Sequence, residues 1–197
     1  MTRIMLDSDQ VDVLVTHGHA LDVAATYSDL LPDVGAVAAL RAKFPARVTL
    51  VLIDRGLGDP SGQASVLDVE RGARIAGQIP GWYDAKEKAG VRFLAVYANR
   101  SNLAAVNAAL GPRHAYRWVA TLDGTCNITG YVPLRTPAAV QILPAARTGL
   151  HADLSLVFES SWHPDPGNTK VARDLLDAQA ELEKLRVLIR DARSGLG

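Results

Sequence analysis

Apolar runs that end in carboxylates are the feature that most constrains how this chain can fold. Residues 47–54 (RVTLVLID) are almost all β-branched or aliphatic, and residues 64–70 (ASVLDVE) stay largely apolar until they finish on two acids. Unbroken apolar runs of this kind are typical of strands covered on both faces, as in parallel sheets and barrels. The chain is therefore expected to build an α/β fold around an enclosed sheet.

Similar runs recur along the chain, with helical patterns between some of them. Strands are expected at residues 3–7, 11–18, 47–54, 64–70, 92–99, 116–124, 138–143 and 150–158, and helices at 21–44 (in two pieces), 79–89 and 101–110. A regular (β/α)₈ barrel usually takes about 250 residues, and strand and helix alternate here only in the first part of the chain. We therefore predict a TIM-like βα-barrel that lacks its last helices. One link is awkward, because the few residues between the first two expected strands cannot form a parallel crossover.

The C-terminal part has a different pattern. Residues 1–164 are assigned to the barrel, and residues 168–197 to a separate coiled-coil-like helix that follows a Pro-Gly break. Apolar residues in this helix alternate at spacings of four and three, which is an a/d heptad seam. The seam predicts self-association or docking to a partner protein, and packing against the barrel is the alternative. The expected oligomerisation residues are Val171, Leu175, Ala178, Leu182, Leu185 and Ile189.

The charge balance excludes some classes of partner. Lysine plus arginine and aspartate plus glutamate each number 21, so the formal net charge is zero. Nucleic acids and anionic membrane surfaces are attracted by a basic excess, so neither is an expected partner.

The N-terminus has no apolar core of a signal peptide. The lone Cys126 cannot form an internal disulfide, and His17 and His19 are interpreted as a polar loop, so we expect no metal or cofactor.

The two acids of residues 68–70 (DVE) are candidate catalytic residues. Side chains two apart on a strand share a face, so Asp68 and Glu70 point the same way. Active sites of βα-barrels lie at the C-terminal ends of the strands. Two close carboxylates there can raise the pKa of one enough to make it a proton donor, as glycoside hydrolysis requires. The alternative is that both are solvated or paired with Arg71 or Arg74.

Two further acids strengthen the candidate site. Asp7 ends the first expected strand, and Asp153 interrupts an apolar strand, where a carboxylate is costly unless it is paired or functional. Asp54 and Asp123 also end strands, but each leads into a glycine turn, where aspartate is ordinary.

Five blocks together resemble a known family. The segments SVLDVERG, GWYDAKEKAGVRFLAVYANRS, YRWVATLDG, AAVQIL and HADLSLVFESSW resemble, in order, the lysozyme-like glycoside hydrolases of family 25, and the related domains of actinobacteria and their phages, over residues 47–164. The resemblance implies metal-free cleavage of peptidoglycan between N-acetylmuramic acid and N-acetylglucosamine. It implies that Glu70 is the general acid, that Asp68 stabilises the transition state or orients the substrate, and that Asp153 and Asp7 complete the acidic cleft.

Substrate contacts are expected from Trp118, Tyr97 and Gln141, and packing in the core is the alternative for the two aromatic side chains. Trp118 is the strongest candidate because it lies on a barrel strand. Relatives often carry tyrosine, part of the sugar platform, at the positions of Leu122, Ile142 and Ala152. Two interpretations follow. One is a phage virion-associated minor tail protein that hydrolyses host peptidoglycan. The other is an inert structural virion protein that keeps the hydrolase fold and assembles through its C-terminal helix.

Overall fold

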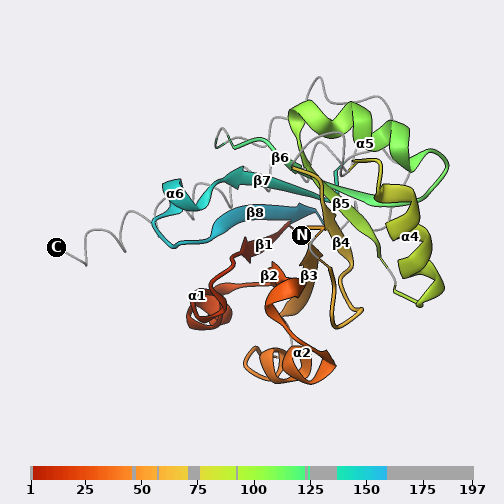
Figure 1. Cartoon of the computed structure of the whole chain (residues 1–197). Coiled ribbons are helices and arrows are strands. Elements are labelled where there is room, and N and C mark those ends of the chain that lie inside the picture. The colour runs from red at the N-terminus through yellow and green to blue at the C-terminus, as the bar shows by residue number, and fades with distance from the viewer. Residues whose placement is uncertain are drawn as a thin grey trace.

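A closed barrel of eight strands forms the centre of the molecule (Figure 1). The structure is a computed structural model that describes residues 2–45, 48–56, 58–70, 76–91, 93–122, 124 and 137–158. The strands are β1 (Thr2–Asp7), β2 (Val23–Tyr27), β3 (Thr49–Asp54), β4 (Val66–Asp68), β5 (Ala95–Asn99), β6 (Tyr116–Ala120), β7 (Ala139–Leu143) and β8 (Asp153–Phe158). Strands β1 to β7 pair in parallel with their neighbours, and β8 runs antiparallel between β7 and β1.

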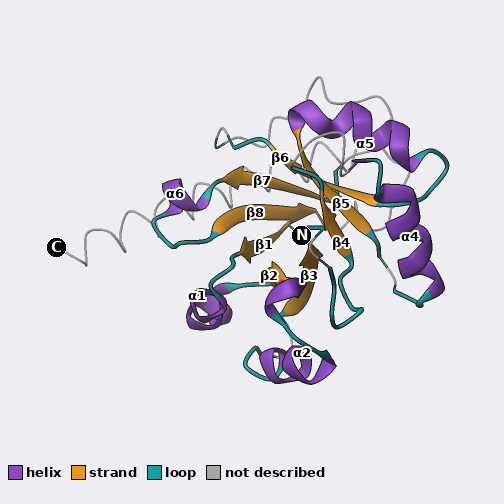
Figure 2. Cartoon of the chain, in the orientation of Figure 1, coloured by secondary structure: helices purple, strands orange, loops and turns teal. Residues whose placement is uncertain are grey.

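Helices lie around the outside of this barrel (Figure 2). The helices and 3₁₀ turns of the described residues are α1 (Val11–His17), η1 (Gly18–Ala20), η2 (Ser28–Leu30), α2 (Val34–Arg41), α4 (Ile79–Lys88), η3 (Arg100–Asn102), α5 (Leu103–Leu110) and α6 (Ala145–Thr148). Figure 1 shows α1 and α2 beside β1 to β3, and α4 and α5 beside β4 to β6. The connection from β7 to β8 contains only the short helix α6. The predicted α/β barrel is thus confirmed.

Two predictions in the N-terminal part were wrong. Residues 11–17 form the helix α1 rather than a strand, and residues 23–27 form the strand β2 rather than helix. The sequence VDVLVTH fits both periods, because Val11, Leu14 and Val15 also lie on one helical face. Once α1 forms, it supplies the crossover that parallel β1 and β2 require, and the awkward link disappears.

Other boundaries differ by smaller amounts. Strand β4 has three residues where seven were expected. The predicted helix 101–110 begins as η3, whose N-cap is Asn99, since Asn99 Oδ1 accepts from the Asn102 amide over 3.2 Å. Helix α5 ends at Leu110 and is followed by Gly111, whose positive φ of 54° suits glycine.

Apolar side chains fill the barrel and also cover its outer face. The inner cluster alternates along each strand with residues that pack under the helices. Its members are Met5, Val23, Ala25, Val51, Ile53, Val66, Ala95, Tyr97, Trp118, Ala120, Ala139 and Val157. Inner residues Met5, Val66 and Val157 set the alternation of β1, β4 and β8, and this alternation decides which strand-end acids face the barrel axis.

The C-terminal helix predicted for residues 168–197, with its six seam residues, lies outside the described residues, as do Asp123 and Cys126. Among the helices that the structure describes, none is both long and apolar enough to span a bilayer.

Helix α4 is tied to the loop before β4 by buried polar contacts. Lys86 forms an ion pair and hydrogen bond with Asp59, and the exposed fractions of the two side chains are 10% and 4%. Asp59 also accepts from the Ala64 amide (2.7 Å) and the Ser61 hydroxyl (2.8 Å). Burial opposes ionisation of Asp59, but its hydrogen bonds with Lys86, Ala64 and Ser61 lower its pKa below the ordinary value. The loop that leads into the short strand β4 is therefore fixed from outside the barrel.

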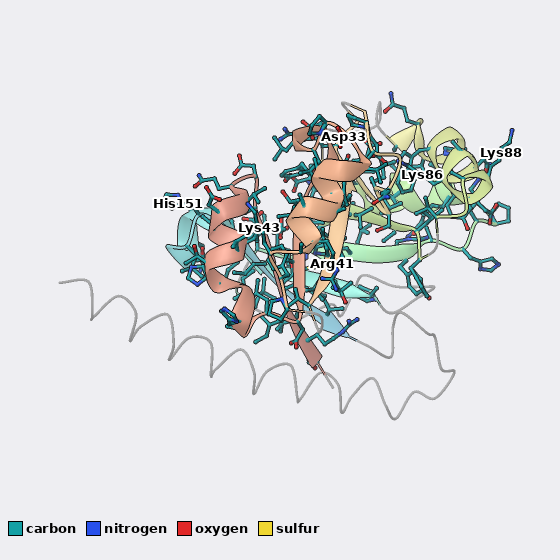
Figure 3. All side chains as sticks on the ribbon, turned by 90° about the horizontal axis from the view of Figure 1, so that it is seen from below. Asp33, Arg41, Lys43, Lys86, Lys88 and His151 are labelled. Atoms are coloured by element: carbon teal, nitrogen blue, oxygen red, sulfur yellow. The ribbon has the colours of Figure 1, made fainter. Side chains whose placement is uncertain are left out.

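Replacing Lys86 tests this anchor. Lys86→Met should lower the free energy of unfolding by about 3 kcal/mol at pH 7, because Asp59 loses its buried counter-charge. The pKa of Asp59 is lowered, so the contribution is present above about pH 4 and is lost as the pH falls through the lowered pKa. Urea denaturation at pH 7 measures the change. Lys88→Met, on the same helix but exposed, is the control (Figure 3), and an equal effect of both substitutions contradicts the anchor.

Candidate active site

Four carboxylates converge at one mouth of the barrel. Asp7 is the last residue of β1, Asp68 is the last residue of β4, and Glu70 follows two residues later. Asp153 is the first residue of β8, and because β8 is antiparallel, its start lies at the same end as the other three acids. The register makes Asp7 the direct partner of Asp153 across the β1–β8 ladder. The strand alternation turns all four toward the barrel axis.

Asp7 is the most deeply placed of the four acids. It is 6% exposed, and its Oδ1 has no hydrogen-bond partner among the described residues. Burial raises the pKa of Asp7 well above its usual value, and the nearby Asp153, Asp68 and Glu70 raise it further. The protonated form of Asp7 is therefore favoured relative to an exposed aspartate.

Asp153 has both a hydrogen-bond donor and acidic side chains as neighbours. Its Oδ1 accepts from the Ala145 amide at the start of α6. Burial raises the pKa of Asp153, the Ala145 amide and the Gln141 side chain lower it, and Glu70 and Asp9 raise it again, so the net shift is upward.

Glu70 lies beyond the end of β4 and is positioned by its neighbours. Its amide donates to Asp68 Oδ1 over 3.0 Å. Asn102, at the start of α5, donates to the carbonyl oxygens of Val69 (2.7 Å) and Glu70 (3.3 Å). The Tyr97 hydroxyl hydrogen bonds Glu70 Oε1 over 2.8 Å. The exposed Glu70 therefore has both its backbone and its carboxyl fixed at the mouth.

The three residues expected to contact substrate lie beneath the carboxylates. Trp118, Tyr97 and Gln141 are only 3%, 8% and 2% exposed. Tyr97 hydrogen bonds Gln141 Oε1, and its ring meets Trp118 edge-on with centroids 5.0 Å apart. Trp118 Nε1 donates to Ser155 Oγ over 3.1 Å. These side chains form a floor that supports the acids and leaves little of its own surface open to a sugar.

Sequence reasoning missed Tyr27 and Arg55. Tyr27 ends β2, and burial followed by the charges of Asp7, Asp68, Asp153 and Glu70 raises its pKa above the ordinary value. The Arg55 guanidinium lies 4.5 Å from the centre of the Tyr27 ring and pairs with Asp29 at 2.7 Å. Tyr27 went unnoticed because residues 21–44 were predicted to be helical, which hid the strand that ends on it.

Other candidate positions face away from the mouth. Asp54 lies on the outer face, where it accepts from the Gly56 amide (2.8 Å) and from Trp82 Nε1 (3.1 Å). This agrees with its interpretation as a turn residue. Ile142 and Ala152, both fully buried, belong to the outer cluster, whereas Leu122 is 37% exposed. Two of the three positions compared with platform tyrosines are therefore closed to substrate.

The two histidines of the N-terminal part lie in neighbouring elements. His17 ends α1, and His19 lies in η1. Within the part of the chain that the structure describes, no group of three or more His, Cys, Asp or Glu side chains is arranged to hold a metal ion.

Comparison with known proteins gives structural matches alone. No protein-family model matches the sequence, and no curated protein matches it. The chain is similar to the modular autolysin LytC from Streptococcus pneumoniae, solved with a synthetic peptidoglycan ligand, at 14% identity and a TM-score of 0.48. It is also similar to GHIP, a glycosyl hydrolase 25 of Streptococcus pneumoniae, at 8% identity and a TM-score of 0.48.

These matches cover 80% of this chain in both cases, but 47% of LytC and 87% of GHIP. The chain thus spans about half the length of LytC. GHIP belongs to the family that the sequence blocks resemble. At these identities and TM-scores, neither protein assigns a role to a residue of this chain.

Proposed function

We propose that this chain is a lysozyme-like glycoside hydrolase that acts on the glycan strands of peptidoglycan, with Glu70 as general acid. The observation that carries the proposal is the convergence of Asp7, Asp68, Glu70 and Asp153 on one barrel mouth. Such a set supplies both the proton donor and the ionised carboxylates that hydrolysis of a glycosidic bond requires.

The chemistry follows from the placement of the acids. Glu70 is the outermost, so its carboxyl can reach the oxygen of a bound glycosidic bond and give it a proton. Positive charge then develops on the sugar ring, and ionised Asp68 and Asp153 stabilise it electrostatically. Water adds to the anomeric carbon, and its proton passes to a carboxylate of the cleft, which balances the reaction.

The energetic cost of the acid cluster supports a functional role. Like charges directly opposite each other in an antiparallel pair destabilise the sheet, and Asp7 faces Asp153 in this way. Asp7 in addition lacks a partner for Oδ1 among the described residues. Titratable groups perturbed by burial and by each other, gathered in one place, are typical of active sites.

The proposed substrate and the proposed location in a virion both rest on the sequence resemblance. The resemblance of residues 47–164 to family 25 and to phage-borne domains points to peptidoglycan and to a minor tail protein carried in a virion. The alternative, an inert structural virion protein, is favoured by the burial of Trp118 and Tyr97, which leaves few aromatic side chains for an open sugar platform.

Removing the proton donor separates these alternatives. Glu70→Gln should lower the release of reducing sugar from isolated actinobacterial peptidoglycan by at least about 100-fold, as expected for loss of a general acid. Glu87→Gln, an exposed glutamate of α4, is the matched control and should leave the rate unchanged. Circular dichroism verifies folding. Equal release by the wild type and Glu70→Gln would refute the role of Glu70, and no release by the folded wild type would favour the inert alternative.

The electrostatic cost of the site can be measured without a substrate. Asp7→Asn should raise the free energy of unfolding at pH 7 by about 1 kcal/mol, because the charge opposite Asp153 is removed. The pKa of Asp7 is raised in the folded state, so the penalty develops as the pH rises from about 4 through the raised pKa. The gain measured by urea denaturation should therefore shrink at pH 4. A loss of stability at pH 7 would show that ionised Asp7 is compensated.

The C-terminal seam gives a prediction on assembly. In the full-length chain, Leu182→Glu places a charge on the proposed a/d seam and should reduce the molar mass measured by light scattering to that of a smaller species. Gln179→Glu, off the seam, should leave the mass unchanged. Identical masses for the wild type and Leu182→Glu would contradict self-association through this seam.

A further inference from the structure

The backbone at Glu70 lies where the neighbouring strands cease to support the chain. Glu70 is two residues past the end of β4. On one side, the pairing of β3 with β4 ends at Asp54 and Leu67, three residues before Glu70. On the other side, the Val69 amide still donates to the Tyr97 carbonyl over 2.8 Å. The segment that carries the candidate acid thus leaves the sheet just before it.

The side chain of Asn102 holds this segment beyond the sheet. Its Nδ2 donates to the carbonyl oxygens of Val69 over 2.7 Å and of Glu70 over 3.3 Å. Backbone carbonyl oxygens only accept hydrogen bonds, so the amide of Asn102 has to present its nitrogen to them. One of the two peptide groups precedes the Cα atom of Glu70 and the other follows it. The direction in which the Glu70 side chain leaves the backbone is therefore fixed from both sides.

Asn102 is itself anchored at the end of β5. Its backbone amide donates to Asn99 Oδ1 over 3.2 Å, and the Ser101 hydroxyl donates to the same oxygen over 2.8 Å. Asn99 is the last residue of β5, and Leu103 is the first residue of α5. The side chain that holds the Glu70 segment therefore starts from a point joined to both β5 and α5.

The orientation of Asn102 argues against a role in its own helix. Asparagine is favoured at the N-cap of a helix because its side-chain oxygen accepts a hydrogen bond from an amide of the first turn. Asn102 occupies the N-cap position of α5, but its side chain makes no capping hydrogen bond in this fully described helix. The side chain is directed instead to the segment after β4.

A further contact shows what the anchored backbone achieves. The Tyr97 hydroxyl hydrogen bonds Glu70 Oε1 over 2.8 Å, and Tyr97 is only 8% exposed. Hydrogen bonds between two oxygens span about 2.5–3.0 Å, so a shift of the segment by about 1 Å would break this contact. The position of the carboxyl thus depends on the position of the backbone that Asn102 binds.

We propose that Asn102 is a positioning residue for Glu70, which binds the two peptide groups on either side of Glu70 and so directs its carboxyl into the cleft. The catalytic meaning rests on the proposed function, in which Glu70 is the proton donor. A general acid has to lie within hydrogen-bond reach of the atom that it protonates. Asn102 acts through the backbone of Glu70 and takes no part in the proton transfer.

Removing the side chain of Asn102 tests the positioning without a substrate. Asn102→Ala deletes both Nδ2 contacts and keeps the backbone contact with Asn99. The NMR order parameter of the Glu70 amide should fall from about 0.85, the value of rigid backbone, to below about 0.6. The amides of residues 103–110 should keep their values, because α5 has no side-chain capping bond to lose.

Kinetics supply the second measurement. In Asn102→Ala, kcat for the release of reducing sugar from solubilised actinobacterial peptidoglycan should fall by about 100-fold, as a misplacement of about 1 Å can cause. KM should stay unchanged, because the side chains of the cleft are all kept. A role limited to fold stability would not lower the kcat of the folded variant.

A second variant and a matched control use the same chemical change. Asn102→Asp keeps the size of the side chain and removes its donors, so it should act like Asn102→Ala and replaces that variant if it does not fold. Asn107→Asp places the same charge on α5. Asn107 Oδ1 accepts from Arg117 Nε over 2.9 Å, a contact that aspartate can also make. This control should leave both the Glu70 order parameter and kcat unchanged.

The outcomes separate this inference from the proposed function. An unchanged Glu70 order parameter in folded Asn102→Ala or Asn102→Asp would overturn the positioning, even if Glu70→Gln abolishes hydrolysis. Wild-type kcat in a variant whose Glu70 has become mobile would also overturn it. Loss of Glu70 order in the variants of a protein that releases no sugar would uphold the positioning and refute the hydrolase. Equal losses in Asn107→Asp and Asn102→Asp would show a general effect of charge on α5 and would overturn the inference.

Discussion

The antiparallel entry of β8 between β7 and β1 is the constraint on which the rest of the structure depends. It closes the barrel, because β8 pairs with the first strand as well as with its predecessor. It also reverses the chain, so that the start of β8 lies at the same end as the finish of β1. Asp153 thereby comes directly opposite Asp7. A parallel last strand would place its first residue at the other end of the barrel, and the acid cluster would not form.

The clustered acids are electrostatically unfavourable, and a layer of neutral polar side chains supports them. Tyr97, Gln141 and Ser155 point inward below the carboxylates and are held by hydrogen bonds and by the edge-on contact with Trp118. Outside the barrel, Asp59 and Lys86 fix the loop that leads to the short strand β4. The outer ion pair positions a strand, while the inner hydrogen bonds position side chains.

Several features were predictable because they depend on local pattern. The apolar runs of β3, β5 and β7 indicated a sheet that is covered on both faces. The spacing of Asp68 and Glu70 placed both side chains on one face of their strand. The segment of helix α1 was predicted to be a strand, because VDVLVTH fits both the helical and the strand period. The segment of strand β2 was predicted to be helical, because VAATY is a short segment with mostly small side chains. The seam of the C-terminal segment lies outside the described residues and stays a prediction. Tyr27 and Arg55 could not be found, since their nearness to the acids depends on barrel closure.

The sequence by itself determined which residues could be inward-facing acids, because strand alternation is a local property of the backbone. It also determined that the chain forms an α/β fold, through apolar runs that need cover on both faces. Only the tertiary structure decided that Asp7 faces Asp153, and that Tyr97 and Gln141 are buried and hydrogen bonded to each other rather than open to a ligand. These relations join strands far apart in the chain, and they depend on the register of a closed sheet, which no local pattern contains.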